Sequence, residues 1–192
     1  MNKRTYFTVE VAIFAALAFV FDLLSNLISV SLWPNGGSIS IAMVPVFLMA
    51  YRWGVKGGLI TGLLLGLLQI LSGTAYILHP VQAILDYIVA FSVIGLSGIV
   101  FKKIQNVKDQ KSKIVTYALL GVLIGSSLRF VAHVIAGAVF FGSGAAEGQS
   151  VIVFSLLYNV SYMLPSIIVC GALVVLLISA APRIFMNKAI QN

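Results

Sequence analysis

Apolar stretches long enough to cross a lipid bilayer follow one another along almost the whole of this chain. The hydrocarbon core of a bilayer is ~30 Å thick, so each helical crossing needs about 20 mostly apolar residues. Of the 192 residues, 60% are hydrophobic and only 9% are charged, whereas a soluble domain has roughly a quarter of its residues charged. Lipid must therefore face most of this protein. Six crossings with short links use up residues 1–192 as a single domain.

Turn signals, prolines and glycines divide the apolar sequence into six segments. We expect helices over residues 6–30, 38–51, 55–71, 80–101, 114–141 and 151–181. The second segment is short and contains Pro45, while a lysine-rich linker, residues 102–113, separates the fourth from the fifth. The predicted fold class is an all-α membrane protein with six transmembrane helices.

The basic residues predict the orientation of these helices. Most Lys and Arg residues fall on one side of a six-helix arrangement: Lys3, Arg4, Arg52, Lys56, Lys102, Lys103, Lys108, Lys111, Lys113, Arg183 and Lys188. The opposite loops contain neither Lys nor Arg. By the positive-inside rule the basic side is cytoplasmic, which places both termini in the cytoplasm and the protein in the cell membrane. The net charge of +7 is then a topological bias and not a sign of nucleic-acid binding.

Three polar residues inside the predicted helices mark a candidate site, because polar groups in a membrane are costly. With a rise of ~1.5 Å per residue, Asp86 lies ~9 Å from the outer face, and His133 and Asn159 both lie ~12 Å from it. They come from three helices and converge on one level in the outer half. The alternative for a single intramembrane histidine is a packing role.

Aromatic residues surround the same level and favour a flat, positively charged ligand. His133, Gly137 and Phe141 are spaced four apart and share a helix face. The glycine is expected to leave room between a polar group and an aromatic plane. The other aromatic candidates are Trp33, Tyr76, Tyr87, Phe154, Tyr158 and Tyr162. A carboxylate, an imidazole, an amide and ring faces can hold such a ligand by ion pairing, stacking and cation–π attraction. Trp33 and Tyr76 have a second interpretation as interfacial anchors.

The remaining membrane-embedded polar groups and a pair of small residues suggest structural roles. Arg129 lies one turn deeper than His133, and Asp22 is its leading candidate as an ion-pair partner. Glu10, near the cytoplasmic end, is expected to snorkel toward the membrane surface or to be solvated. Ala12 and Ala16 form a small-xxx-small pair that lets another helix approach closely, although packing inside the bundle is the simpler reading.

Several short motifs together resemble one known family. They are Tyr51-Arg52-Trp53-Gly54-Val55-Lys56, His79-Pro80-Val81-Gln82 with Asp86-Tyr87, Leu128-Arg129-Phe130 with His133, and Tyr158-Asn159 with Pro165. The family is that of the thiamine-specific S components of energy-coupling factor (ECF) vitamin transporters. The resemblance covers nearly the whole chain.

The resemblance implies a six-helix protein that captures thiamine from outside and does no chemistry on it. The implied partners are a transmembrane coupling protein and two ATPase subunits that hydrolyse ATP; no cofactor or metal is implied. The binding pocket falls on Trp33, Tyr76, Asp86, Tyr87, His133, Gly137, Phe141, Phe154 and Asn159. The docking motif falls on Ala12 and Ala16, which reverses the simpler reading of that pair. Compared with the family pattern, Asp86 replaces a glutamate, Phe141 a tryptophan and Phe154 a tyrosine.

Three other functions are left open. An S component for another vitamin would share the fold and differ only in the pocket lining. An intramembrane enzyme could use Asp86 and His133 as acid and base, but the sequence offers neither a nucleophile nor a metal-ligand set beside them. A self-sufficient secondary transporter is disfavoured because the sequence lacks paired broken helices and internal repeats.

Overall fold

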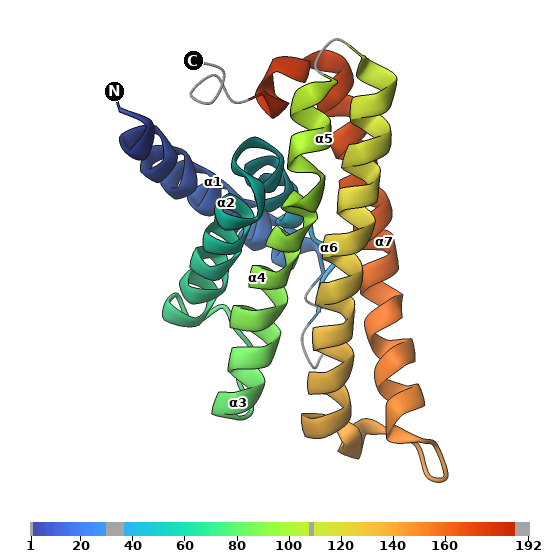
Figure 1. The fold of residues 1–192 in the computed structure, drawn as a ribbon. Coiled ribbons are helices and arrows are strands. Elements are labelled where there is room, and N and C mark those ends of the chain that lie inside the picture. Colours follow the sequence, from blue (N-terminus) through green and yellow to red (C-terminus); the bar gives the residue numbers. More distant parts are fainter. Residues whose placement is uncertain (1, 30–36, 108–109, 187–192) are drawn as a thin grey trace.

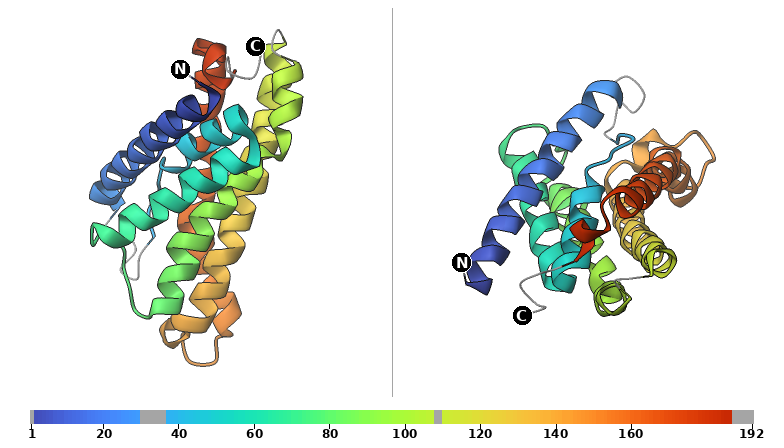
Figure 2. Two further views of the ribbon diagram at one scale, coloured as in Figure 1. Left: turned by 60° about the vertical axis from the view of Figure 1, so that its left-hand side comes forward. Right: turned by 90° about the horizontal axis from the view of Figure 1, so that it is seen from above.

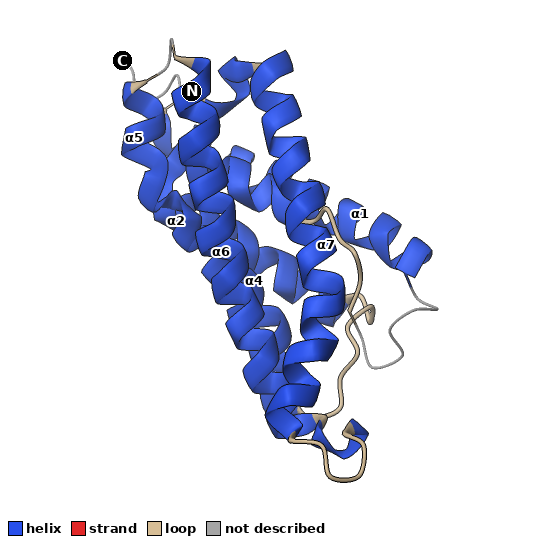
Figure 3. Ribbon diagram, turned by 90° about the vertical axis from the view of Figure 1, so that its right-hand side faces the viewer, coloured by secondary structure: helices blue, strands red, loops and turns tan. Residues whose placement is uncertain are grey.

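The computed structural model describes residues 2–29, 37–107 and 110–186, and every regular element in these ranges is a helix (Figures 1 and 3). The elements are α1 (Lys3–Ser29), α2 (Met43–Leu71), α3 (Pro80–Ala83), η1 (Ile84–Val89), α4 (Ala90–Val93), η2 (Ile94–Val100), α5 (Phe101–Asn106), α6 (Lys111–Phe140), η3 (Gly142–Gly144), α7 (Val151–Ala180) and η4 (Pro182–Phe185). Trp33, one of the predicted ligand residues, lies outside the described ranges.

Five helical stretches of the described chain are long and apolar enough to cross a membrane. They are Lys3–Leu27, Met43–Leu71, Pro80–Asn106, Lys111–Phe140 and Val151–Ala180. The protein is thus an all-helical, multi-pass membrane protein. The stretches at 38–51 and 55–71, predicted as two helices, form one element here, and the geometry inside α2 explains why.

The first half of α2 packs against α6 and is separated from the second half by Gly54. This glycine has φ 71° and ψ −165°, a backbone conformation open mainly to glycine. Before it, Phe47 lies against Gly125 and Tyr51 lies against Gly121. Rising residue numbers in α2 thus meet falling numbers in α6, so this half runs antiparallel to α6.

The second half of α2 packs against the helical rod formed by residues 80–106. Val55 lies against Gly98, and Gly66 lies against Tyr87, so this half runs antiparallel to the rod. Since the rod and α6 themselves run in opposite directions (Figure 1), the chain reverses at Gly54. α2 is therefore a helical hairpin with a short first arm, which corresponds to the short predicted second segment.

The rod changes helix type along its length. It is π-helical over Ile84–Val89 and 3-10 helical over Ile94–Val100. The expected helix 80–101 continues to Asn106, because Ile104 is fully buried and the Gln105 amide donates to the carbonyls of Tyr51 (2.9 Å) and Phe185 (2.8 Å). These contacts hold the lysine-bearing turn against the bundle.

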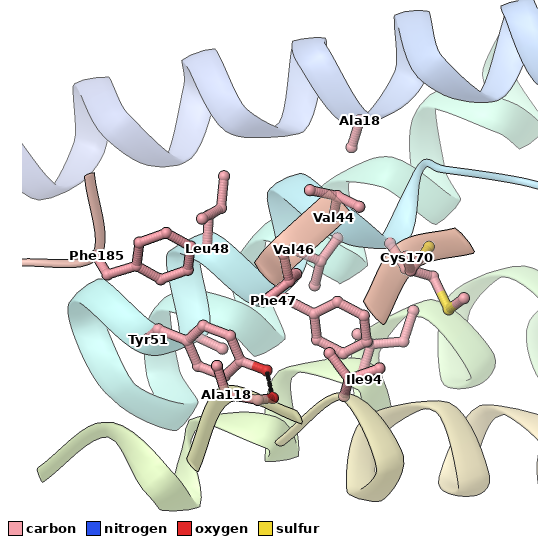
Figure 4. Close-up of a cluster of buried hydrophobic side chains, with 14 of the residues drawn as sticks. Ala18, Val44, Val46, Phe47, Leu48, Tyr51, Ile94, Ala118, Cys170 and Phe185 are labelled. Carbon is pink, nitrogen blue, oxygen red and sulfur yellow. Dashed lines mark hydrogen bonds between the residues drawn. The ribbon is translucent and has the colours of Figure 1, made fainter. Parts of the chain in front are cut away.

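The core lies between the first arm of α2, the rod, α6 and α7 (Figure 4). Tyr51 is fully buried and its hydroxyl donates to the Ala118 carbonyl at 2.6 Å, which satisfies its polar end. Cys170 is also fully buried in this core, in keeping with a packing role. α6 and α7 run side by side over most of their length, and α1 leans across α2 (Figures 1, 2 and 3).

The two ends of the bundle differ in charge. The start of α1, the hairpin turn of α2, α5, the start of α6 and η4 share one end (Figure 1). This basic end carries all described Lys and Arg residues except Arg129: Lys3, Arg4, Arg52, Lys56, Lys102, Lys103, Lys111, Lys113 and Arg183. The opposite end holds the loop 72–79, α3 and η3.

Candidate functional site

A cavity of about 480 Å³ lies toward the end opposite the basic residues, within the size range of small-molecule sites. Its walls come from α1, α2, the loop 72–79, the rod, α6 and α7. Eight of the predicted ligand residues line it: Tyr76, Asp86, Tyr87, His133, Gly137, Phe141, Phe154 and Asn159. The structure thus gathers these eight residues, which are up to 83 positions apart in the sequence, around one cavity.

A chain of three polar side chains crosses one wall of the cavity. The Arg129 Nε donates to His133 Nε2 at 3.1 Å. A guanidinium only donates hydrogen bonds, so His133 Nε2 is the acceptor and carries no proton. The proton of this neutral imidazole is therefore on Nδ1, which donates to Asp86 Oδ1 at 2.8 Å. Arg129 thus fixes the tautomer with which His133 orients the carboxylate.

Gln82 holds the second oxygen of the same carboxylate. Its Nε2 donates to Asp86 Oδ2 at 2.7 Å and to the Tyr76 carbonyl at 3.2 Å, and its Oε1 accepts from the Leu78 amide at 3.0 Å. The Tyr87 hydroxyl also binds this loop, accepting from the Tyr76 amide at 2.7 Å. The loop 72–79 is thereby tied to the π-helical turn that carries Asp86 and Tyr87. π-Helical turns frequently occur at functional sites.

Asn159 joins α7 to the same group of residues. Its amide nitrogen donates to the Ser155 carbonyl at 2.9 Å and lies 3.4 Å from the His133 carbonyl, while its Oδ1 accepts from Tyr162 Oη at 2.5 Å. Asp86, His133 and Asn159 therefore meet, as their predicted depths required. Gly137 lines the cavity and has a second role, because a Cβ there would collide with the Ser155 hydroxyl. Its lack of a side chain also lets α6 and α7 approach closely.

Aromatic rings form the remaining walls. Tyr76 and Phe141 lie with ring centroids 6.2 Å apart, and Phe154 and Tyr158 with centroids 6.0 Å apart. His133 meets Tyr162 edge-on, with centroids 6.1 Å apart. These rings offer faces for stacking and for a cation.

The deep end of the cavity contains polar groups that the expected ion pair does not explain. Asp22 and Arg129 form no ion pair within 4.0 Å; among the described residues the Arg–carboxylate contact within this distance joins Arg52 to Glu10. Asp22 instead accepts from Asn26 at 3.0 Å, and Arg129 lies 4.3 Å from the centroid of the Phe91 ring. Arg129 Nη1 and Gln69 Oε1 are buried without a hydrogen-bond partner among the residues that the structure describes. Both residues line the cavity.

The chain matches known proteins over nearly its full length. The model of the family "Thiamine transporter protein (Thia_YuaJ)" matches residues 8–186. This chain belongs to the thiamine transporter protein family. It is 48% identical to the thiamine transporter ThiT of Bacillus subtilis over 188 residues, covering 97% of both chains. It is 31% identical to ThiT of Lacticaseibacillus paracasei, covering 97% of this chain and 94% of the relative.

A solved structure supports the same relationship. The structure of ThiT from Listeria monocytogenes superposes with a TM-score of 0.87 at 36% identity, covering 96% of this chain and 100% of that one. Members of the thiamine transporter protein family are transport proteins and not enzymes.

Some residues that line the site in this family member are absent from the sequence-based prediction. The main ones are Asn26, Gln69, Thr74, Gln82 and Ser155. Gln82 could have been predicted from the sequence, since it lies four residues before Asp86 in the same predicted helix. Asn26 and Gln69 were harder to predict, because the sequence marks them only as amides near the outer ends of apolar segments.

The proposed docking residues of this family member lie on the surface. Ala12 and Ala16 are exposed on α1, whereas the inward face of the same helix is formed by Val11, Ala15 and Ala18. Packing inside the bundle therefore does not account for the pair, and the small-residue stripe is available to another helix.

Glu10 is not solvated as expected. Its carboxylate accepts from Arg52 Nε at 2.9 Å, from Arg52 Nη2 and from Trp53 Nε1 at 2.6 Å. Arg52 Nη1 also donates to the carbonyls of Ile184 and Met186. The reason for the difference is the hairpin turn of α2, which brings Arg52 and Trp53 against α1.

Proposed function

We propose that this protein captures thiamine from the outer side of the membrane as the S component of an ECF-type transporter. The observation that carries the proposal is the cavity around the Asp86–His133 pair in a chain of the thiamine transporter protein family. A separate coupling protein and two ATPase subunits would supply the energy by hydrolysing ATP. The protein itself would do no chemistry on the vitamin.

The chemistry of thiamine complements the cavity. Its thiazolium ring carries a permanent positive charge, which the Asp86 carboxylate and the surrounding ring faces stabilise. Its aminopyrimidine ring offers donors and acceptors to groups such as Asn159. A carboxylate has about four acceptor positions, and Asp86 uses two of them for His133 and Gln82. Two positions therefore stay open for the ligand.

We further propose that the chain crosses the membrane six times with both termini in the cytoplasm. The short first arm of α2, its reversal at Gly54 and the gathering of basic residues at one end support this topology. Single cysteines introduced as Ser112→Cys and Ser143→Cys in a Cys170→Ala background test it. A membrane-impermeant maleimide added to whole cells should label position 143 and leave position 112 unlabelled. The reverse pattern would overturn the orientation.

The exposed Ala12–Ala16 stripe supports docking of the coupling protein on α1. Replacing both alanines by leucine should prevent close helix approach while leaving the cavity intact. The expected result is normal thiamine binding with loss of uptake in cells that contain the energising module. Uptake at the wild-type rate in the double variant would contradict docking at this stripe.

A competition experiment tests the substrate. Radiolabelled thiamine should be retained by the purified protein and displaced by unlabelled thiamine, but not by riboflavin, biotin or pyridoxine. Displacement by one of these vitamins at lower concentration than by thiamine would assign a different substrate to the same fold. Chemical conversion of the bound ligand, detected by mass spectrometry, would instead indicate an enzyme.

A further inference from the structure

A second cavity lies at the basic end of the molecule, away from the thiamine site. It has a volume of about 380 Å³ and is lined by Lys3, Arg4, Phe7, Trp53 and Lys56. Three of these five residues are cations, and they come from two helices, α1 and α2. The two aromatic rings meet edge-on with centroids 5.2 Å apart, and Lys56 Nζ lies 5.8 Å from the centroid of the Phe7 ring.

The cations of this cavity have no acidic partner in the described chain. Glu10 is the acidic side chain nearest in sequence to α1's basic start, and its carboxylate is occupied by Arg52 and Trp53. The other carboxylate contact within 4.0 Å joins Asp86 to His133 at the far end. Three like charges therefore converge without compensation, which favours an anion between them.

The start of α1 adds to this preference. The helix begins at Lys3 and has no acidic residue in its first turn. Cations at the positive end of a helix dipole are unfavourable, and an anion placed there stabilises the helix end. The dipole and the three side chains thus point to the same ligand charge.

The position of the cavity favours a lipid over a soluble anion. It lies between the start of α1 and the hairpin turn of α2, and these two helices pack side by side (Figure 2). Both helices are long and apolar enough to cross a membrane, and Leu63, two turns along α2 from Lys56 on the same face, is an exposed apolar side chain. A phosphate held by the cations would let acyl chains lie along this surface, as in basic headgroup sites next to transmembrane helices.

We propose that this cavity, formed by Lys3, Arg4 and Lys56 over the Phe7 and Trp53 rings, binds the phosphate of an anionic glycerophospholipid. The bound lipid would fix the start of α1 against the hairpin turn of α2. The site is separate from the thiamine cavity, so this proposal does not depend on which ligand the outer cavity takes.

Trp53 provides a direct reporter. The chain has two tryptophans, so a Trp33→Phe variant leaves Trp53, inside the proposed site, as its sole indole. This variant is placed in phosphatidylcholine vesicles with increasing fractions of brominated phosphatidylglycerol or, separately, brominated phosphatidylcholine. Quenching should show a preference for phosphatidylglycerol of about five-fold or more, since each basic residue near a membrane surface contributes appreciably to anionic-lipid binding. Equal quenching by the two lipids would overturn the proposal.

A charge-matched control distinguishes lipid binding at this cavity from general electrostatic attraction to the basic end. Lys3→Gln, Arg4→Gln and Lys56→Gln together should abolish the preference in the reporter background. Lys102→Gln, Lys113→Gln and Arg183→Gln remove the same charge from exposed positions at the same end and should retain it. Equal loss in both triple variants would mean that net charge, and not this cavity, attracts the lipid. Added glycerol phosphate should not relieve the quenching; relief at millimolar concentration would make the ligand a soluble phosphate instead of a lipid.

Discussion

The two ends of the bundle each hold a carboxylate among cationic and aromatic groups, but they use it differently. At the basic end, Glu10 accepts three hydrogen bonds from Arg52 and Trp53. Arg52 also binds backbone carbonyls next to and within η4. This carboxylate therefore joins α1, the hairpin turn of α2 and the C-terminal region, and its acceptor positions are largely used inside the protein.

At the other end, the Asp86 carboxylate accepts two hydrogen bonds and borders a cavity of about 480 Å³. Its neighbours His133 and Gln82 orient it without covering it. Deeper in the same cavity, Arg129 Nη1 and Gln69 Oε1 have no hydrogen-bond partner within the described part of the chain, although unpartnered buried polar atoms are uncommon in folded proteins. The comparison teaches that a saturated carboxylate holds helices together, whereas an oriented, incompletely used one is available to a ligand.

The largest effect should come from Asp86→Asn, which keeps the shape of the side chain and removes its charge. We expect thiamine affinity to fall by about 2–5 kcal/mol, the range for removing one member of a buried charged pair at an interface. Filter binding with radiolabelled thiamine measures this, and the thermal unfolding midpoint checks that the variant is folded. Wild-type affinity in the folded variant would remove Asp86 from the site.

The opposite variant, Glu10→Gln, should separate stability from binding. It removes the negative charge of the carboxylate to which Arg52 and Trp53 donate. The free energy of unfolding should therefore fall by about 1–3 kcal/mol, less than for a fully buried pair. Thiamine affinity should stay within about two-fold of wild type. Glu147→Gln, on an exposed loop, is the matched control and should change neither quantity. A large loss of affinity in Glu10→Gln would mean that the two ends are coupled.

Gly137→Ala tests whether the close approach of α6 and α7 shapes the site. The added methyl group would meet the Ser155 hydroxyl and push α7, with Asn159, away from His133. Overpacking of this kind costs about 1–3 kcal/mol, and we expect both stability and affinity to fall. Gly171→Ala provides the control, because its Cβ would meet only Leu119 at an ordinary 3.5 Å. Equal effects of the two substitutions would argue against a special role for Gly137.

The smallest effect is expected for Gln82→Met, which preserves length and loses the amide. Asp86 would lose one of its two hydrogen bonds, and the loop 72–79 would lose one of its links to the rod. The affinity should fall by about 0.5–1.5 kcal/mol, less than the full contribution of a hydrogen bond to a charged group, because Gln82 acts on the ligand only through Asp86. If the loop link matters, calorimetry should also show a less favourable entropy of binding. No change in affinity would limit Gln82 to a structural role.

Much of this organisation could be predicted from the sequence. The rise per residue of a helix placed Asp86, His133 and Asn159 at one level, and the structure brings them together. The alternation of basic loops predicted a separate short segment before Gly54, and α2 has a separate short arm there, while the count of six membrane crossings stays a prediction. The position of a residue along a helix can be read from the sequence alone, which is why the common level of the three polar residues was predictable.

The rest depended on contacts between helices that no single stretch of sequence specifies. The reversal at Gly54 brings Arg52 and Trp53 to Glu10, so a residue expected to be solvated is bonded. Whether Arg129 pairs with Asp22 depended on how α1 packs against α6; in the structure it instead donates to His133, one turn away on its own helix. Gly137 was predicted to make space for a ligand; it does line the cavity, but its contact with Ser155 of α7 could not be read from either helix alone.

The most direct test of the central claim is a calorimetric titration of the purified wild-type protein with thiamine. If the outer cavity is a thiamine site, the titration should saturate at one thiamine per chain. Protein that unfolds cooperatively on heating yet gives no saturable heat with thiamine would contradict the assignment.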